Sequence, residues 1–283
     1  LRIGANAIAI QIYQPGYSHF SYLHRGAAGA LAWLEIDDEI PLVTDSRWRV
    51  RRNPTFSSAV ERVSIYGSGV EVRDLRRDDG WTAPAYDAGA WSAARIVAPP
   101  ASPLWSGLQL RSAPLLREEV ALYTPTQPAS GPATPRLLAS RGGDAPTQPD
   151  PHLRLRAGWT GASPTATACD DDGWFAPQLG DGESRSWLFD LGRGWTCQGI
   201  AEVTGAAGGE ELLISYADKT RDGELVLSDP ATYCRVRLTD ATRLAPGSQS
   251  VEGFTLRGGR YLLCALTGPT GPDFRIRWGV CTA

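Results

Sequence analysis

Apolar and polar residues alternate along much of this chain with the period of a β-strand. The clearest runs are 8–13, 70–73, 187–192, 235–238 and 274–281. Because successive side chains of a strand point to opposite faces, these runs predict sheets with one apolar and one wetter face. No segment of a dozen residues keeps a clean helical period, and the best helix candidate, 115–123, is short. The pattern therefore predicts an all-β protein of packed antiparallel sheets.

Turn signals and a change in composition divide the chain. Asp-Gly, Pro-Gly and Gly-Gly pairs separate the apolar runs, at 79–80, 181–182, 222–223, 246–247 and 258–259. Between about 124 and 151 the chain is rich in Pro, Ser, Thr and Gly, which are poor material for a sheet core. We predict two β-sandwich domains, 1–115 and 151–283, joined by a Pro/Gly-rich linker over 116–150.

Composition narrows the classes of partner. The chain has 283 residues, enough for two domains, and a net charge of −3, which gives no electrostatic reason to bind nucleic acid or a membrane surface. No apolar run approaches the roughly 20 residues that span a bilayer. The five cysteines include no C-x-x-C pair, which argues against a zinc site or a disulfide framework. We expect small buried thiols, which fit a reducing compartment and favour a cytoplasmic location.

Aromatic residues near turns are the candidates for sugar binding, which needs a ring for stacking and hydrogen-bonding groups around it. Such residues are Trp81, Tyr86, Trp91, Trp105, Trp159 and Trp174. The alternative is burial at a sheet edge, which we expect for Trp91 and weigh equally with sugar contact for Trp81 and Trp174. The polar and aromatic loop 17–24 adds His19 and Tyr22. The predicted carbohydrate contacts are Trp81, Tyr86, Trp174, His19 and Tyr22.

Clusters of acidic residues are the candidates for glycosidase chemistry, which uses paired carboxylates. The clusters are 37–39, 78–79, 118–119 and 170–172. Neighbouring acids on a strand point to opposite faces, so we predict no catalytic residue among them and expect solvated loops. Asp170 and Asp172, before Gly173, could instead supply oxygen ligands to calcium, although the regular spacing of a calcium loop is absent. No other cofactor is predicted.

Motifs along both halves occur in a recognisable order. They include Gly4, Asn6, Thr44, Asp45, Trp48, Gly80, Trp81, Tyr86, Asp87, Trp91, Pro114, Leu115 and Glu118. This order resembles the N-terminal β-sandwich region of bacterial α-L-rhamnosidases, including its "TDxsWrv" strand and its Gly-Trp…Tyr-Asp…Trp segment. Weaker similarity to the next sandwich of these enzymes follows at 190–193, Tyr216, 222–223 and 257–262. The family's glutamate after the tyrosine is missing, since the chain reads Tyr216-Ala217-Asp218.

The resemblance implies two galactose-binding-like or jelly-roll sandwiches, the first incomplete at its N-terminus. It also implies an accessory segment of a glycoside hydrolase that removes terminal α-L-rhamnose. In that family the catalytic carboxylates lie on a helical (α/α) barrel, which no stretch here resembles. The implied partners are the missing catalytic domain and a rhamnose-containing glycan. Two alternatives stay open: a stand-alone carbohydrate-binding or adhesion protein, and a self-contained β-sandwich hydrolase.

Overall fold

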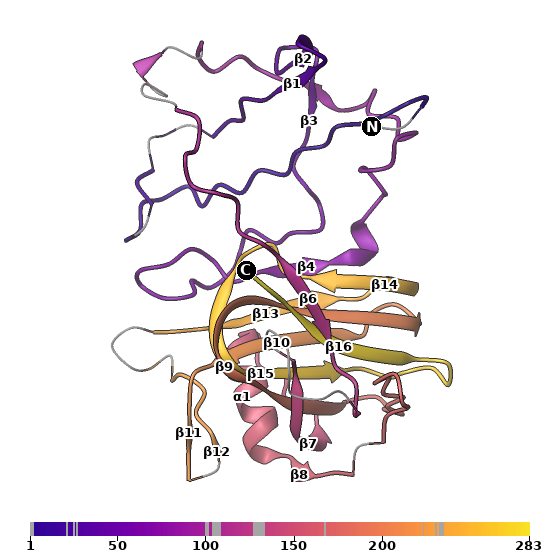
Figure 1. The fold of residues 1–283 in the computed structure, drawn as a ribbon. Coiled ribbons are helices and arrows are strands. Elements are labelled where there is room, and N and C mark those ends of the chain that lie inside the picture. Colours follow the sequence, from indigo (N-terminus) through magenta and orange to yellow (C-terminus); the bar gives the residue numbers. More distant parts are fainter. Residues whose placement is uncertain are drawn as a thin grey trace. The chain divides into compact units, whose positions relative to one another are not determined.

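Two compact units make up the protein, seen in a computed structural model. The structure describes residues 3–20, 22–24, 26, 28–99, 102–103, 109–126, 134–166, 168–222, 224–229, 231 and 235–283. The first unit comprises Leu1–Pro54 and Asp78–Pro114, and the second comprises Thr55–Arg77 and Leu115–Ala283. Strands predominate in the described residues and pair mainly in antiparallel fashion, which confirms the all-β class (Figure 1).

The first unit contains two small antiparallel pairs of strands. β1 (Trp33–Ile36) pairs with β2 (Glu39–Val43), and β3 (Arg49–Val50) pairs with β5 (Ser92–Ala93). The turn between β1 and β2 places Asp37 and Asp38 at φ of 50° and 65°, a left-handed conformation that Asp tolerates. The predicted strand over 8–13 is absent, since no described strand pairs with this run and its isoleucines are exposed.

The second unit is organised by a ten-stranded sheet. Its main path is β4 (Val72–Asp74), β13 (Thr239–Arg243), β10 (Glu211–Ala217), β15 (Arg257–Thr267), β9 (Glu183–Ala206), β16 (Arg275–Thr282) and β6 (Glu119–Leu122). β14 (Gly247–Glu252) and β7 (Arg136–Asp144) also pair with β9, and β8 (Ser163–Pro164) pairs with β7. Only β4 joins its neighbour in parallel among the described strands. A separate small pair is β11 (Thr220–Arg221) with β12 (Glu224–Leu225), and η1 (Leu75–Arg77) follows β4.

The long strand β9 takes part in both layers of a sandwich. Its first part pairs with β7 and β15, and its last part pairs with β14 and β16. Side chains from both parts meet in one buried cluster, where the Trp187 ring of β9 lies 5.6 Å from the Trp278 ring of β16. Trp187, Phe189 and Ile276 are at most 1% exposed there. The alternating apolar positions predicted at 187–191 and 274–280 therefore face a sandwich core.

Helix α1 (Pro151–Gly161) packs on the other face of the large sheet, against β13, β10, β7 and β9 (Figure 1). Leu155 and Trp159 of α1 pack with Leu213 and Leu263 in a second buried cluster. Asp150 caps the helix by accepting backbone N–H groups of residues 152 and 153, and Pro151 occupies the first turn. Sequence analysis missed this helix, although the Asp150-Pro151 pair is a recognisable helix start. The segment 115–123, which was the best of the weak helix candidates, contains β6 instead.

The unit boundaries differ from the predicted domains 1–115, 116–150 and 151–283. The segment 116–150 contributes β6 and β7 to the large sheet, although its flanks are rich in proline. The segment Thr55–Arg77 belongs to the second unit because β4 pairs with β13, about 170 residues away in sequence. Composition indicates where loops lie, but pairing between distant strands decides which unit a segment joins.

Two further expectations concern cysteines and membranes. Cys197, Cys264 and Cys281 are buried free thiols and Cys169 is partly buried; Cys234 lies outside the described residues. Burial raises the pKa of the Cys197 thiol to about 12, so it stays protonated at neutral pH. No helix within the described ranges is long and apolar enough to cross a membrane.

Candidate functional site

Three aromatic residues of the first unit form a cluster with Arg51 and Asp79, which we call the aromatic corner. The Trp91 ring centroid lies 6.2 Å from that of Trp81 and 5.6 Å from that of Tyr86. The Arg51 guanidinium lies 4.4 Å from the Trp91 centroid, within cation–π range. The structure therefore brings the predicted sugar-contacting residues Trp81 and Tyr86 together around Trp91.

Hydrogen bonds use up much of the polar surface of the aromatic corner. Arg51 donates from both terminal nitrogens to the Asp79 carboxylate, at 2.6 Å for Nη1, and the Tyr86 hydroxyl donates to the same carboxylate at 2.6 Å. Arg51 and Tyr86 lower the pKa of Asp79 to about 2. Trp91 Nε1 donates to the Tyr86 oxygen at 3.3 Å. Tyr86 and Trp91 thus stabilise the corner, which leaves Trp81 as its strongest candidate for contact with a ligand.

The structure also brings His19 and Tyr22 together in the first unit. The two residues form an isolated antiparallel bridge, and their ring centroids are 5.6 Å apart. The Tyr22 hydroxyl donates to Gln14 Oε1 at 2.7 Å, and Gln14 Nε2 lies 2.8 Å from His24 Nδ1. Gln14 was missed from sequence because it precedes the loop and lies ten residues from His24. The group offers rings and polar atoms on one short stretch of chain.

Trp174, Asp170 and Asp172 share one turn of the second unit. Asp170 Oδ1 accepts the backbone N–H groups of Asp172 and Trp174, at 3.1 and 2.9 Å. Gly173 has φ of +84°, and a Cβ there would lie 2.0 Å from the Tyr123 carbonyl oxygen. Asp170 therefore organises the turn. In the described part of the chain, no group of three or more His, Cys, Asp or Glu is placed to hold a metal, and calcium at Asp170 and Asp172 stays a prediction.

The Trp174 ring carries a charged neighbour. The Arg277 guanidinium lies 5.0 Å from the Trp174 ring centroid and donates to Glu202 Oε2, at 3.0 Å for Nε. Trp174 is partly buried, and the Arg277 guanidinium lies over its ring. An aromatic ring beside an arginine and a carboxylate is suitable for contact with a sugar, although the ring also has a structural neighbour.

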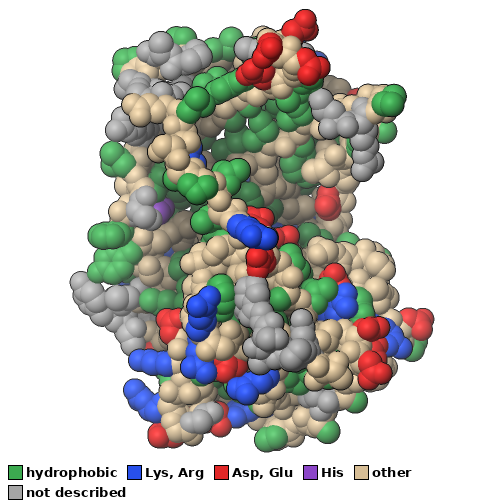
Figure 2. Space-filling view, in the orientation of Figure 1, with side chains coloured by type: hydrophobic (Ala, Val, Ile, Leu, Met, Phe, Trp, Pro, Cys, Tyr) green, Lys and Arg blue, Asp and Glu red, His purple; other side chains and the backbone are tan. Residues whose placement is uncertain are grey.

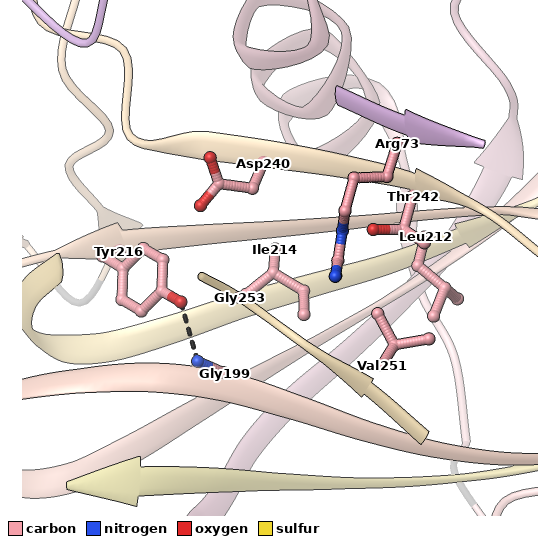
Figure 3. A pocket seen from close by; sticks show the side chains of 9 residues that line it. All are labelled: Arg73, Gly199, Leu212, Ile214, Tyr216, Asp240, Thr242, Val251 and Gly253. Atoms are coloured by element: carbon pink, nitrogen blue, oxygen red, sulfur yellow. Dashed lines mark hydrogen bonds between the residues drawn. The ribbon is translucent and has the colours of Figure 1, made fainter. Parts of the chain in front are cut away.

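A pocket opens between the two layers of the second unit (Figure 3). It has room for about one water molecule. Arg73 extends into it from β4, and Tyr216 and Asp240 contribute polar atoms from β10 and β13. The Gly199 N–H donates to the Tyr216 oxygen at 2.7 Å, and a Cβ at Gly199 would lie 2.6 Å from Ile214 Cγ2.

Most of the polar groups around this pocket are held by hydrogen bonds. Asp240 accepts from Arg257 at 2.8 Å and from the Glu71 N–H at 2.7 Å, and Glu71 accepts the Phe254 and Thr255 N–H groups. Burial lowers the pKa of Arg73, and its buried Nε finds no hydrogen-bond partner within the described residues. Sequence analysis missed this group because Glu71 and Arg73 lie on a run that predicts a solvated strand face.

Two aromatic candidates remain, Trp159 and Trp105. Trp159 is 2% exposed on α1, with the Arg141 guanidinium 4.2 Å from its ring centroid, so it belongs to the core. Trp105 lies outside the described residues. Figure 2 shows acidic and basic side chains interspersed on the visible face of the second unit. Most of the exposed large apolar side chains belong to the first unit, including Ile3, Phe20 and Leu110.

Comparison with known proteins defines the class of the fold. No protein-family model and no curated protein matches the sequence. The GH78 family rhamnosidase of Bacillus sp. GL1 aligns with a TM-score of 0.68 and 18% identity, over 94% of this chain and 45% of that chain. The chain therefore has a β-sandwich fold of the type found in that rhamnosidase. The resemblance to rhamnosidases that the sequence predicts is confirmed at the level of fold.

Two other solved structures align less closely. The α-L-rhamnosidase from Dictyoglumus thermophilum gives a TM-score of 0.45 and 19% identity, over 87% of this chain and 21% of that chain. A fucolectin from striped bass (Morone saxatilis) serum gives 0.25 and 13%, over 52% and 47%. The fold assignment rests on the Bacillus enzyme, of which this chain spans less than half.

Proposed function

We propose that this chain is the accessory β-sandwich part of an α-L-rhamnosidase-like glycoside hydrolase, in which it frames a catalytic domain. The observation that carries the proposal is the fold match to the Bacillus GH78 rhamnosidase, which covers 94% of this chain but 45% of the enzyme. A chain that corresponds to less than half of an enzyme supports a role beside the catalytic domain.

The carboxylates support the same role. Retaining and inverting glycosidases need two carboxyl groups that face one sugar ring. Several of the acids here are instead held by internal partners: Asp79 by Arg51, Asp190 by Arg260, and Asp240 by Arg257. The exposed large apolar side chains described in the first unit are available to a partner surface. We assign that surface to the catalytic domain of the parent enzyme.

Assay of the purified chain tests the accessory role. We expect no turnover of an aryl α-L-rhamnoside above the rate of a sample without protein. Turnover that follows the protein through successive purification steps would show that the chain is itself a hydrolase. Sequencing the parent gene provides a second test, and we expect it to encode a helical barrel with acidic motifs.

A second candidate function is carbohydrate binding, as part of that enzyme or as a stand-alone binding or adhesion protein. Trp81 in the aromatic corner and Trp174 beside Arg277 and Glu202 favour it. Calorimetric titration with rhamnose and with galactose tests this function. We expect saturable binding that is weakened in Trp81→Ala or Trp174→Ala by about 0.5–2 kcal/mol, which is the range for a lost stacking or cation–π contact.

Matched controls separate binding from folding. Trp33 of β1 is 55% exposed and was not predicted to bind sugar, so Trp33→Ala should bind as the unaltered chain does. Repeating the titration with calcium or a chelator, and with Asp170→Asn, tests the calcium prediction. Absence of saturable binding to either sugar would leave the chain a structural spacer for the catalytic domain.

A further inference from the structure

A buried histidine joins α1 to the sheet of the second unit. His152 is the second residue of α1 and is 1% exposed. Its Nδ1 lies 2.7 Å from the Thr239 hydroxyl on β13, and its Nε2 lies 2.9 Å from the Ser228 carbonyl oxygen. Both ring nitrogens are therefore engaged, one by the sheet and one by the chain that follows β12.

The partners determine which nitrogen carries the proton. A carbonyl oxygen can only accept, so Nε2 must donate to Ser228. The Ser228 hydroxyl donates to the Val236 carbonyl at 2.9 Å, which leaves its oxygen, 3.2 Å from Nε2, as a second acceptor. Nδ1 of the neutral ring then accepts from the Thr239 hydroxyl. Each polar atom in the group has a partner when the ring is neutral.

A second proton on the ring would break this arrangement. Nδ1 would become a donor, and the Thr239 hydroxyl would have to accept and turn its own hydrogen away. Thr239 is 0% exposed, and within the described residues its hydroxyl has no other hydrogen bond. A buried donor without an acceptor costs about 1–3 kcal/mol. Burial also lowers the pKa of His152, in the same direction as this geometric cost.

Charges around the ring offer no compensation. Asp150 at the start of α1 accepts from Arg237 at 2.6 Å, and Arg156 of α1 donates to Asp229 at 3.3 Å. Arg154 of α1 is paired with Glu211 of β10, and Asp240 of β13 is paired with Arg257 of β15. Arg243, at the end of β13, is a further positive charge and acts electrostatically on Asp74. A protonated His152 would add one positive charge to a neutral set of ion pairs.

We propose that His152 is an acid-sensitive latch, which holds α1 on the sheet while its ring is neutral and loosens the helix when the ring is doubly protonated. Loosening α1 would uncover the buried face around Leu213 and Leu263, against which Leu155 and Trp159 pack. The latch is independent of the proposed function, because it rests on contacts within the second unit alone.

Histidine NMR tests the first step of this proposal. The chain has three histidines, so the ring signals of His19, His24 and His152 can be assigned from His19→Gln, His24→Gln and His152→Gln. We expect His152 to titrate at a lower pH in the folded chain than in the urea-unfolded chain. A folded midpoint of His152 equal to or above the unfolded one would overturn the proposal, because the folded state would then not resist protonation.

Hydrogen–deuterium exchange of the full chain tests the second step. With intrinsic exchange rates corrected for pH, the opening constant of α1 should rise between pH 7.5 and pH 5. The rise is up to about tenfold for each pH unit by which the folded pKa of His152 lies below that of the open state. The rise should persist in His24→Gln and disappear in His152→Gln, which has a non-titrating amide. An unchanged opening constant in the unaltered chain would refute the latch, even if His152→Gln fails to fold.

Discussion

One buried carboxylate, Asp190, lies where the pairing of β9 with β15 is interrupted, and its removal gives a quantitative prediction. Asp190 is 4% exposed and accepts from Arg260 Nε and Nη2 at 2.9 and 3.0 Å, and from the Gly192 N–H at 2.8 Å. Gly192 has φ of +79°, and the pairing of β9 with β15 is interrupted opposite this point. The carboxylate thus joins two motif segments, 190–193 and 257–262, which lie far apart in sequence.

The expected loss in the free energy of unfolding depends on which hydrogen-bond acceptors remain after each substitution of Asp190. In Asp190→Asn the amide oxygen can still accept from Gly192, so the loss is the charged part of the Arg260 bond, about 1–2 kcal/mol. In Asp190→Ala both acceptors are lost. Breaking a buried pair costs about 3–5 kcal/mol when the remaining charge stays buried. The Arg260 side chain is 42% exposed and can reach water, so we expect about 2–3 kcal/mol.

Urea unfolding, followed by tryptophan fluorescence, measures this loss as a change in the free energy of unfolding. The control is Arg136→Gln, since the Arg136 side chain is 71% exposed and lies 3.4 Å from Asp190, and we expect at most about 0.5 kcal/mol. Arg260 and the Gly192 N–H lower the pKa of Asp190. The stabilisation is therefore complete above the unfolded pKa near 3.9 and is lost as pH falls through the folded pKa. Asp190→Ala with the stability of the unaltered chain would refute this account.

Three other tests address the glycine turn, the unit boundary and the aromatic corner. Gly173→Ala should lower the free energy of unfolding by about 2 kcal/mol or more, because Gly173 has a positive φ and an added Cβ would meet the Tyr123 oxygen. Gly161→Ala is the control and should be tolerated, because a Cβ there would have no atom within 4 Å. Equal free energies of unfolding for the two variants would contradict this reasoning. The fragment 115–283 lacks β4 and Glu71, so gel filtration and urea unfolding should show aggregation or reduced stability, and a monomer as stable as the full chain would disprove the boundary. In the aromatic corner, Asp79 stays ionised until pH falls to about 2. Protonation of Asp79 weakens its bonds to Arg51 and Tyr86, so we expect tryptophan fluorescence to change near that pH in the unaltered chain and not in Asp79→Asn.

Particular residues show how far sequence reasoning reached. Alternation located strands at 187–191 and 274–280, because a buried face needs an apolar residue at every second position. It failed at 8–13, where the described structure has no partner strand for an equally regular pattern. Helix α1 was missed because its apolar positions are few, and its surest signal was the Asp-Pro start rather than a periodic stripe.

The candidate site was predicted only in its local parts. Trp81 with Tyr86, and Trp174 with Asp170, are close in sequence, so their association within one turn could be expected. The contacts of Arg51 with Trp91 and of Arg277 with Trp174 could not, because they join separate segments. The pocket lined by Arg73, Tyr216 and Asp240 is assembled from three strands, and no local pattern predicts it.

The sequence by itself determined the all-β class, several of the turns and the resemblance to α-L-rhamnosidases, because strand period, turn residues and ordered motifs are local properties of the chain. The turn predicted at 258–259 is wrong, because these two glycines lie within β15. Only the tertiary structure decided that β4 joins the second unit, that α1 covers one face of its sheet, and that His152 meets Thr239. These depend on contacts between residues that are roughly 60 to 170 positions apart. Such contacts are selected by the packing of the whole sheet, so neighbouring residues carry little information about them.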